Sequence, residues 1–346
     1  MLFPKKEVTS VKNSHSDTKN KNKFKITNKM GITIVIILLS LLISTQSGKF
    51  FSQINFITIA RICSVTILVG YAQMVVIAGG GLNVSIGAIG GLSAVVVGAL
   101  IQRAGVPWGF AIVLAIMIGA CCGAFNGFVI TRLGGTGEIS WLTTLATMSI
   151  FTGISLTITK ANPFYDLPEG FDWIGVYNIG GWVPFMIVIT IVFTFILWYM
   201  FKYTSFGHQI LAIGGNKKAA ELSGIKVKQV MMMKHIISAV IAACAGILFS
   251  TRLGSIGSDI GGDWMLFSFA APLIGGTRME GGRVDVVGAF LGGLLLAIVS
   301  NGVVHLQVNV YIVEMMEGII ILLAVGLDRI RLLREEHRER MERAAL

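Results

Sequence analysis

Long apolar stretches, separated by short polar breaks, recur along most of the chain. A helix needs about twenty mostly apolar residues to cross a bilayer. The stretches that reach or approach this length are residues 31–47, 54–78, 84–102, 109–133, 139–159, 183–202, 229–251, 264–278, 286–304 and 308–327. The third and the eighth are short, polar or rich in glycine, so we expect bent or discontinuous helices there, buried by their neighbours. The pattern predicts an all-α polytopic membrane protein with about ten transmembrane helices.

The composition agrees with a membrane protein and argues against a soluble one. Of the 346 residues, 54% are apolar and 13% are charged, whereas an average soluble domain has about 25% charged residues. The four cysteines, Cys63, Cys121, Cys122 and Cys244, all fall inside apolar stretches. We interpret them as small buried hydrophobic residues and not as a disulfide or a metal site.

Positive charge is concentrated at the two ends of the chain and in alternate breaks between the predicted spans. Residues 1–30 hold eight lysines and two acids, and residues 329–346 hold six arginines. Because the inner segments of membrane proteins collect Lys and Arg, we expect both termini in the cytoplasm. The net charge of +10 is then explained by orientation and not by nucleic acid binding. We predict a disordered cytoplasmic tail (1–30), a transmembrane domain (31–328) and a cytoplasmic C-terminal tail (329–346).

This orientation assigns each break to one side of the membrane. The breaks expected inside are 79–83, 133–138, 203–228 and 279–285. The breaks expected outside are 48–53, 103–108, 160–182 and 252–263. The break 160–182 mixes Pro, Gly and aromatic residues, so it predicts a surface loop with a half-buried helix.

Two sets of glycines at four-residue spacing indicate close helix packing. Gly119, Gly123 and Gly127 share one helix face, and Gly288 and Gly292 repeat the pattern. Small residues at this spacing let a neighbouring helix approach closely. They predict a compact bundle, which many transporters and channels share.

A run of three glycines, Gly79–Gly81, interrupts the apolar pattern just before two polar residues. Each glycine costs about 1 kcal/mol relative to alanine in a helix, so we expect a break. Breaks of this kind often line a pathway in transporters, but a tight turn capped by Asn83 explains the same residues equally well. The candidate path residues at membrane depth are Asn83, Ser85, Asn126, Thr144 and Ser268, each of which could instead bond a neighbouring helix.

Charged residues and catalytic motifs are scarce in the predicted spans. Glu314 and Glu317 begin the last span near its outer end, where we expect them to reach water, and the central spans carry few charges apart from Arg61. The chain has no P-loop, zinc-protease or nucleophile-elbow motif. Its five histidines are scattered, so we predict neither an enzyme nor a metal site.

The longest break expected inside, 203–228, predicts a short, well-capped helix. Asn216 is a good N-cap residue, the run KKAAELS favours a helix, and Gly224 suits the position after its end. A helix of about two turns is marginal alone, so it must dock on something. A groove on another protein and the chain's own loops are equally good candidates on these grounds.

The stretch TSFGHQILAIGGNKKAAELSGIKVKQV is similar to the cytoplasmic loop of the ribose-type sugar permeases of bacterial ABC importers. The matching loop positions include Gly207, Gly214, Asn216, Ala219, Ala220, Ser223 and Gly224. The likeness extends over about 55–328, through GGGLNVSIGAIGGLSA, FNGFVITRLG and AAPLIGGTRMEGGRVDVVGAFLGG. In that family the loop helix docks on the ATPase subunit, so the resemblance implies that Ala219 and Ala220 fit a groove there.

The resemblance also implies a function and a set of partners. The chain would be the membrane-spanning subunit of an importer in the bacterial inner membrane, translocating a monosaccharide or similar small polar solute. It would form a homodimer or heterodimer of permeases within the lipid bilayer. A tandem ABC ATPase, which binds ATP and Mg, and an extracytoplasmic solute-binding protein would complete the complex, so this chain needs no cofactor. The alternative is a secondary transporter or channel that works alone and needs buried charges for ion coupling.

Several residues depart from the pattern of that family. Asn83 replaces the usual Asp, Met265 and Phe267 stand where acids are common, and Ser140 replaces Pro. The fold should survive these changes, which bear on the pathway and on the solute. Pairing with a second, different permease subunit is one explanation.

Overall fold

The computed structural model describes residues 28–135 and 137–305, together with Met315, Gly318, Ile319, Leu322 and Gly326. Apart from residues 28–30 and these five residues, the structure does not describe the two predicted tails or the predicted span 308–327. Glu314 and Glu317 therefore lie outside the described residues. The elements are α1 (Asn28–Gln46), α2 (Gln53–Ala78), α3 (Ile86–Ala104), α4 (Trp108–Arg132), α5 (Gly137–Thr159), α6 (Glu169–Val176), β1 (Asn178–Ile179), β2 (Val183–Pro184), α7 (Phe185–Tyr203), α8 (Ser205–Gly215), α9 (Lys217–Leu222), α10 (Val227–Leu253), α11 (Trp264–Ile274) and α12 (Val286–His305).

Within the described ranges, eight helices are long and apolar enough to cross a membrane. They are α1, α2, α3, α4, α5, α7, α10 and α12, so the prediction of an all-α polytopic protein is confirmed. The third predicted span is a complete 19-residue helix. The eighth was predicted at 264–278 but ends at Ile274, and its 11 residues extend only about 16 Å, roughly half a bilayer core. The one sheet in the described part is a short antiparallel hairpin of β1 and β2.

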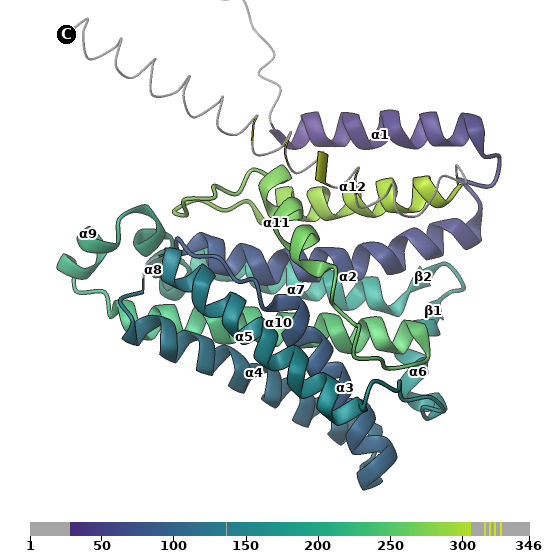
Figure 1. Cartoon of the computed structure of the whole chain (residues 1–346). Helices are drawn as coiled ribbons and strands as arrows, with labels where there is room; N and C mark the ends of the chain where they lie inside the picture. The colour runs from purple at the N-terminus through teal and green to yellow at the C-terminus, as the bar shows by residue number, and fades with distance from the viewer. Residues whose placement is uncertain are drawn as a thin grey trace, which may run out of the picture.

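Breaks expected inside lie at one end of the bundle, and breaks expected outside lie at the other (Figure 1). At the end that carries α8 and α9, Lys217 donates hydrogen bonds to the carbonyls of Gly134 and Gly135 in the α4–α5 turn. At the other end, Gln53 donates to the Gly181 carbonyl of the hairpin, and Arg103 stacks on Phe164. The fold therefore separates these inner breaks from the outer breaks 48–53, 103–108 and 160–182.

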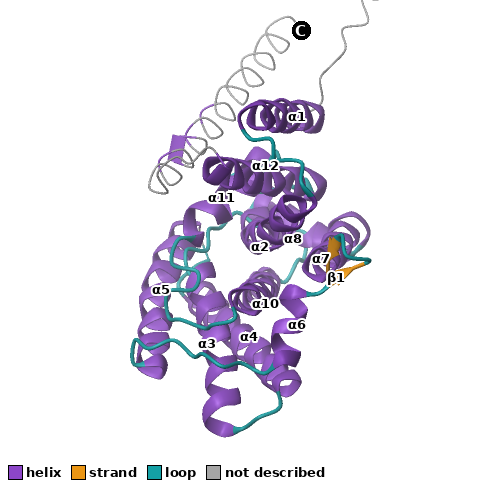
Figure 2. Ribbon diagram, turned by 90° about the vertical axis from the view of Figure 1, so that its right-hand side faces the viewer, coloured by secondary structure: helices purple, strands orange, loops and turns teal. Residues whose placement is uncertain are grey.

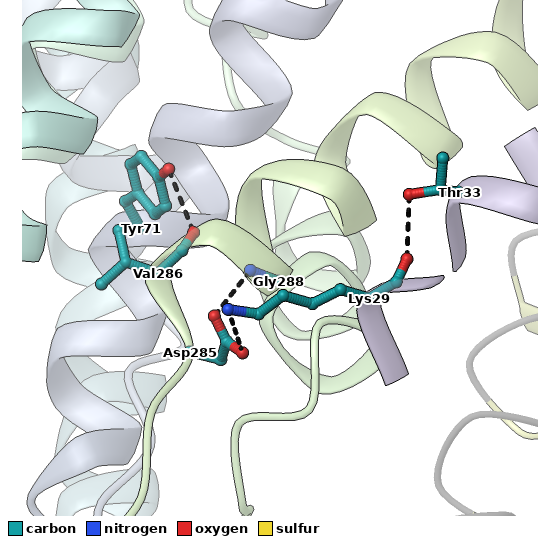
Figure 3. A network of polar contacts seen from close by, with 6 residues as sticks. All are labelled: Lys29, Thr33, Tyr71, Asp285, Val286 and Gly288. Atoms are coloured by element: carbon teal, nitrogen blue, oxygen red, sulfur yellow. Dashed lines mark hydrogen bonds and ion pairs between the residues drawn. The ribbon is translucent and has the colours of Figure 1, made fainter. Parts of the chain in front are cut away.

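Helices α2 and α10 form the centre of the bundle (Figure 2). Helix α10 packs on α2, α3 and α4, whereas α1 lies at the edge and packs on α12. A polar cluster joins α1 to α12 at the α8–α9 end (Figure 3). The Asp285 carboxylate accepts from the Gly288 backbone N–H at 2.9 Å, which caps α12, and pairs with the Lys29 ammonium at 3.0 Å.

The glycines predicted to pack helices lie at the closest helix contacts. A Cβ on Gly123 would lie 2.5 Å from the His235 carbonyl oxygen of α10, and Gly119 and Gly127 face the same helix. On α12, a Cβ on Gly292 would lie 2.2 Å from the Ala271 carbonyl oxygen of α11. A Cβ on Gly288 would lie 2.0 Å from the carbonyl oxygen of Gly275, which follows α11. Only glycine allows these backbones to approach so closely.

The outer break predicted at 252–263 begins only after α10 ends at Leu253, and the segment 254–263 does not stay at that end of the bundle. Ile256 forms a backbone bridge with Phe164 near the outer end of α3. The chain then runs inward along α3, so that Cβ atoms on Gly91 and Gly87 would lie 2.2 and 1.9 Å from carbonyl oxygens of this segment. Gly87 lies in the first turn of α3, eleven residues before Gly98. The non-helical segment therefore runs about 16 Å along α3, from the level of Gly98 to the level of Gly87.

The loop 160–182, predicted to lie outside, contains the predicted half-buried helix. In α6, Phe171 and Gly175 are buried, whereas Trp173 and Val176 are exposed. The Arg61 guanidinium of α2 donates to the Val176 carbonyl at 2.7 Å and fixes the end of α6.

Candidate functional site

Four of the five predicted path residues meet in one buried hydrogen-bonded cluster beside the Gly79–Gly81 break. Ser85 Oγ donates to Asn83 Oδ1 at 2.8 Å, and Asn126 Nδ2 donates to Ser85 Oγ at 2.9 Å. The Val84 backbone N–H donates to Thr144 Oγ1 at 3.0 Å. We call Asn83, Ser85, Asn126 and Thr144 the break cluster; each of these residues is at most 1% exposed.

The break cluster satisfies the backbone that the helix interruption frees. Ser85 takes the N-cap position of α3, and the Asn83 side chain accepts from the Ser85 backbone N–H at 3.0 Å. Ser140 Oγ donates to the Leu82 carbonyl at 2.7 Å. With its amide turned to match its partners, Gln73 donates to the Asn83 carbonyl at 2.9 Å. In this conformation the cluster is closed and inaccessible to solute.

Ser268 does not join the cluster. It lies on α11, where its hydroxyl donates to the Met265 carbonyl of its own helix at 2.7 Å. Asn301, a polar residue of α12, donates to Asn55 Oδ1 on α2 at 2.9 Å. These two residues bond locally or to a neighbouring helix.

Three glycine-containing segments that are far apart in sequence meet beside the break. A Cβ on Gly214, in the last turn of α8, would lie 2.0 Å from the Ala78 carbonyl oxygen and 2.5 Å from the Gly282 nitrogen. A Cβ on Gly281 would lie 2.7 Å from the Gly80 nitrogen. The Gly282 backbone N–H donates to the Ala78 carbonyl at 3.0 Å. We call Gly80, Gly214, Gly281 and Gly282 the glycine junction; it ties α8 to the end of α2.

Lys234 of α10 holds the same end of α2 from the other side. Its ammonium donates to the carbonyls of Val76 at 3.2 Å and Gly79 at 3.1 Å, and the residue is 1% exposed. The C-terminal end of a helix carries partial negative charge, which a cation stabilises. Lys234 thus supplies charge-assisted hydrogen bonds to carbonyls in the last turn of α2, where the regular helical hydrogen-bond pattern ends.

The predicted short helix is α9, and both of its predicted caps are present. Asn216 Oδ1 accepts from the Ala219 backbone N–H at 3.0 Å. At the other end Gly224 has a φ of +82°, and the Ile225 N–H donates to the Ala220 carbonyl at 3.1 Å. This reverse turn is a Schellman motif. The preceding helix α8 begins with Thr204 as its cap and turns back on α7, where Gly207 fits against the Met200 carbonyl.

One expectation about α9 is wrong. Ala220 is only 4% exposed and packs into the core of its own chain. The outward face of α9 instead presents Ala219 and Leu222, and the Leu222 side chain is 84% exposed. The physical reason is the tie from Lys217 to the α4–α5 turn, which fixes the rotation of the helix.

A cavity of about 670 Å³ opens beside the glycine junction. It lies between the Gly80–Leu82 turn, the first turns of α5 and the 279–280 loop. Its lining residues are Gly80, Gly81, Leu82, Gly137, Glu138, Trp141, Leu142, Met279 and Glu280. No group of three or more potential metal ligands occurs among the described residues.

Comparison with protein families decides what kind of molecule carries this arrangement. Residues 55–325 match the family model described as the permease component of the branched-chain amino acid transport system. The chain belongs to this permease family.

The permease also resembles named importers over most of its length. It is 36% identical to the ribose import permease protein of Bacillus subtilis (strain 168), over 88% of this chain and 94% of that protein. It is 32% identical to the D-allose transport system permease protein of Escherichia coli (strain K12), over 93% and 98%. It is 31% identical to the galactose/methyl galactoside import permease protein of the same strain, over 88% and 95%. No solved structure matches the permease.

Sequence reasoning missed three residues of the permease that matter at the break. Lys234 lies within the predicted span 229–251, so Arg61 is not the one charged residue of note in the central spans. Gln73 and Ser238 also contact Asn83 from within apolar spans. A polar residue inside an apolar span was the available signal.

Proposed function

We propose that this permease is the membrane-spanning subunit of an ATP-driven importer that carries a monosaccharide across the bacterial inner membrane. The observation that carries the proposal is the likeness, over 88–93% of the chain, to permeases that import ribose, allose or galactose. The break cluster and the glycine junction support it, because they place an interrupted helix in direct contact with the loop that carries α9.

The proposed path runs past the break cluster. In the closed conformation, most hydroxyl and amide groups of the cluster are hydrogen-bonded, whereas the buried Asn126 Oδ1 accepts no hydrogen bond. When α8 moves, the glycine junction transmits the movement to the end of α2, and the same polar groups become available to a hydroxylated solute. The cavity beside the Gly80–Leu82 turn is then the proposed exit.

The proposed partners follow from the same family likeness. A separate ATPase binds ATP and Mg, so the permease carries no cofactor of its own. A second permease copy, identical or different, completes the membrane part, and an extracytoplasmic binding protein delivers the solute. Helix α9 is the proposed docking helix for the ATPase, with Leu222 as its apolar contact.

We expect Leu222→Arg to release the ATPase without harming the fold of the permease. Leu222 is 84% exposed, so arginine is tolerated in the free chain. An unpaired charge buried in an interface costs about 3–5 kcal/mol, which weakens the complex by about a hundredfold or more. Co-purification of the ATPase with tagged permease measures the effect.

The matched control is Leu253→Arg, which adds the same charge to an exposed leucine at the opposite end of the bundle. This variant should retain the ATPase. If Leu222→Arg retains it equally well, α9 is not the docking helix. A normal melting temperature for both variants shows that the permease itself is folded.

We expect α9 to lie on the cytoplasmic side, as the distribution of lysines and arginines indicates. Lys218 is exposed, and the hydrogen bonds to the α4–α5 turn come from its neighbour Lys217, so cysteine at 218 leaves that tie in place. In a background without the native cysteines, Lys218→Cys should react with an impermeant maleimide only after the cells are opened. Labelling from outside intact cells would reverse the proposed orientation.

A further inference from the structure

The segment 254–263 runs along α3 as non-helical backbone. Non-helical backbone at membrane depth is tolerated only where protein covers it or where it lines a water-filled cavity. One side of this segment is covered by α3, through the contacts of Ile260 and Gly261. Gly262 and Asp263, at its inner end, remain exposed. Because non-helical backbone at this depth needs polar cover, the uncovered side requires water or another polar occupant.

A cavity of about 240 Å³ lies where this segment joins α11. It is lined by residues of α2, α10, α11 and α12, and we call it the outer cavity. Its polar and aromatic lining consists of Thr66, Arg252, Asp263, Trp264, Phe267 and Ser300. This volume is below the range of drug-sized ligand sites, about 300–1,000 Å³, so it suits a ligand of one small ring.

The lining combines two kinds of group that suit a sugar. Trp264 is held edge-to-face against Phe249, with ring centroids 5.7 Å apart, and is 5% exposed, so its ring is a rigid apolar wall. The guanidinium of Arg252 and the carboxylate of Asp263 offer several donors and acceptors, and the hydroxyls of Thr66 and Ser300 add more. A sugar ring has an apolar C–H face and a rim of hydroxyls, and this lining is complementary to both.

We propose that the outer cavity is a binding subsite for a single monosaccharide ring on the permease itself. The proposal rests on the function proposed above and adds to it a place where the solute contacts this chain. The ring lies against Trp264 and Phe267, and its hydroxyls bond Arg252 and Asp263. An acyl chain cannot form hydrogen bonds with Arg252 or Asp263, so lipid is the less suitable occupant.

Protection of an engineered cysteine from a thiol reagent tests this assignment. Ser300→Cys places a thiol in the cavity, and Val304→Cys places one on the same helix at a residue that is 65% exposed and outside the cavity lining. Both are made in the full permease complex with the native cysteines replaced. A small impermeant methanethiosulfonate is added from outside, with and without D-ribose, D-allose or D-galactose, and with sucrose as the control for osmolarity.

We expect one of the monosaccharides to slow modification at 300 but not at 304. Protection follows 1 + [L]/Kd, so a sugar at ten times its Kd slows the reaction about tenfold. Arg252→Gln should lower this protection. Thr66→Val, which keeps the shape of the side chain, should lower it as well, and it provides the test if Arg252→Gln does not fold.

Uptake of the same sugars, measured in parallel, separates the two claims. Uptake without protection at 300, or no modification at 300 at all, overturns the subsite and leaves the proposed function standing. Protection without uptake of any monosaccharide supports the subsite and contradicts the importer.

Discussion

Replacement of Gly214 by alanine is expected to abolish transport and to lower the melting temperature of the purified permease. The new methyl group would lie 2.0 Å from the Ala78 carbonyl oxygen and 2.5 Å from the Gly282 nitrogen, so backbone has to move. Overpacking of this kind costs about 1–3 kcal/mol, and more where no flexible side chain can yield. Because the Gly282 N–H also bonds Ala78, the strain falls on the contact that ties α8 to α2.

The neighbouring glycine provides the control. Gly215 lies in the same helical turn, and a Cβ there meets nothing within 4 Å. Gly215→Ala should therefore keep the wild-type melting temperature and transport rate. Equal behaviour of the two variants would contradict the glycine junction. A Gly214→Ala protein that melts normally but no longer couples ATP hydrolysis to transport would assign the junction a purely mechanical role.

The largest loss of stability is expected for Lys234→Glu. The ammonium of Lys234 lies 3.2 and 3.1 Å from two carbonyl oxygens, and a carboxylate there would face the same oxygens without a donor. A buried charge without a partner costs about 3–5 kcal/mol. The negative end of α2 adds repulsion. We expect the variant to be degraded or to melt far below the wild type, and Lys234→Gln, which keeps a donor, to fall between them.

The same substitution at Lys228 separates burial from charge. Lys228 is exposed in the first turn of α10, where an acidic residue favours the helix dipole. Lys228→Glu should leave the melting temperature unchanged or slightly higher. A Lys234→Glu protein as stable as Lys228→Glu would show that the ammonium does not hold the end of α2.

The spans were predictable because hydropathy is a local property of the sequence. Helix α8 was not predicted, although Gly207, Ile210 and Ile213 are buried at three-residue spacing, since its 11 residues fall short of the length of a membrane span. The caps of α9 were predicted correctly because Asn216 and Gly224 act within a few residues. The rotation of α9 was not, since a tertiary contact from Lys217 decides that Ala220 faces inward.

The candidate site was predictable only in part for a similar reason. Asn83 and Ser85 stand beside a glycine run that marks a break, so their shared cluster was within reach of sequence reasoning. The glycine junction joins positions 80, 214 and 281, and nothing local in the sequence pairs them. The inward course of 254–263 was hidden because its Gly, Ser and Asp residues are also typical of a surface loop.

Accumulation of a labelled monosaccharide by proteoliposomes tests the central claim most directly. The vesicles contain the permease complex purified from its own membranes, with ATP and Mg enclosed and D-ribose, D-allose or D-galactose outside together with the binding protein. The account predicts that at least one of these sugars accumulates above its outside concentration, only when ATP is present, and not with Leu222→Arg permease. Accumulation that persists without ATP, or no accumulation of any of the three sugars, would contradict it.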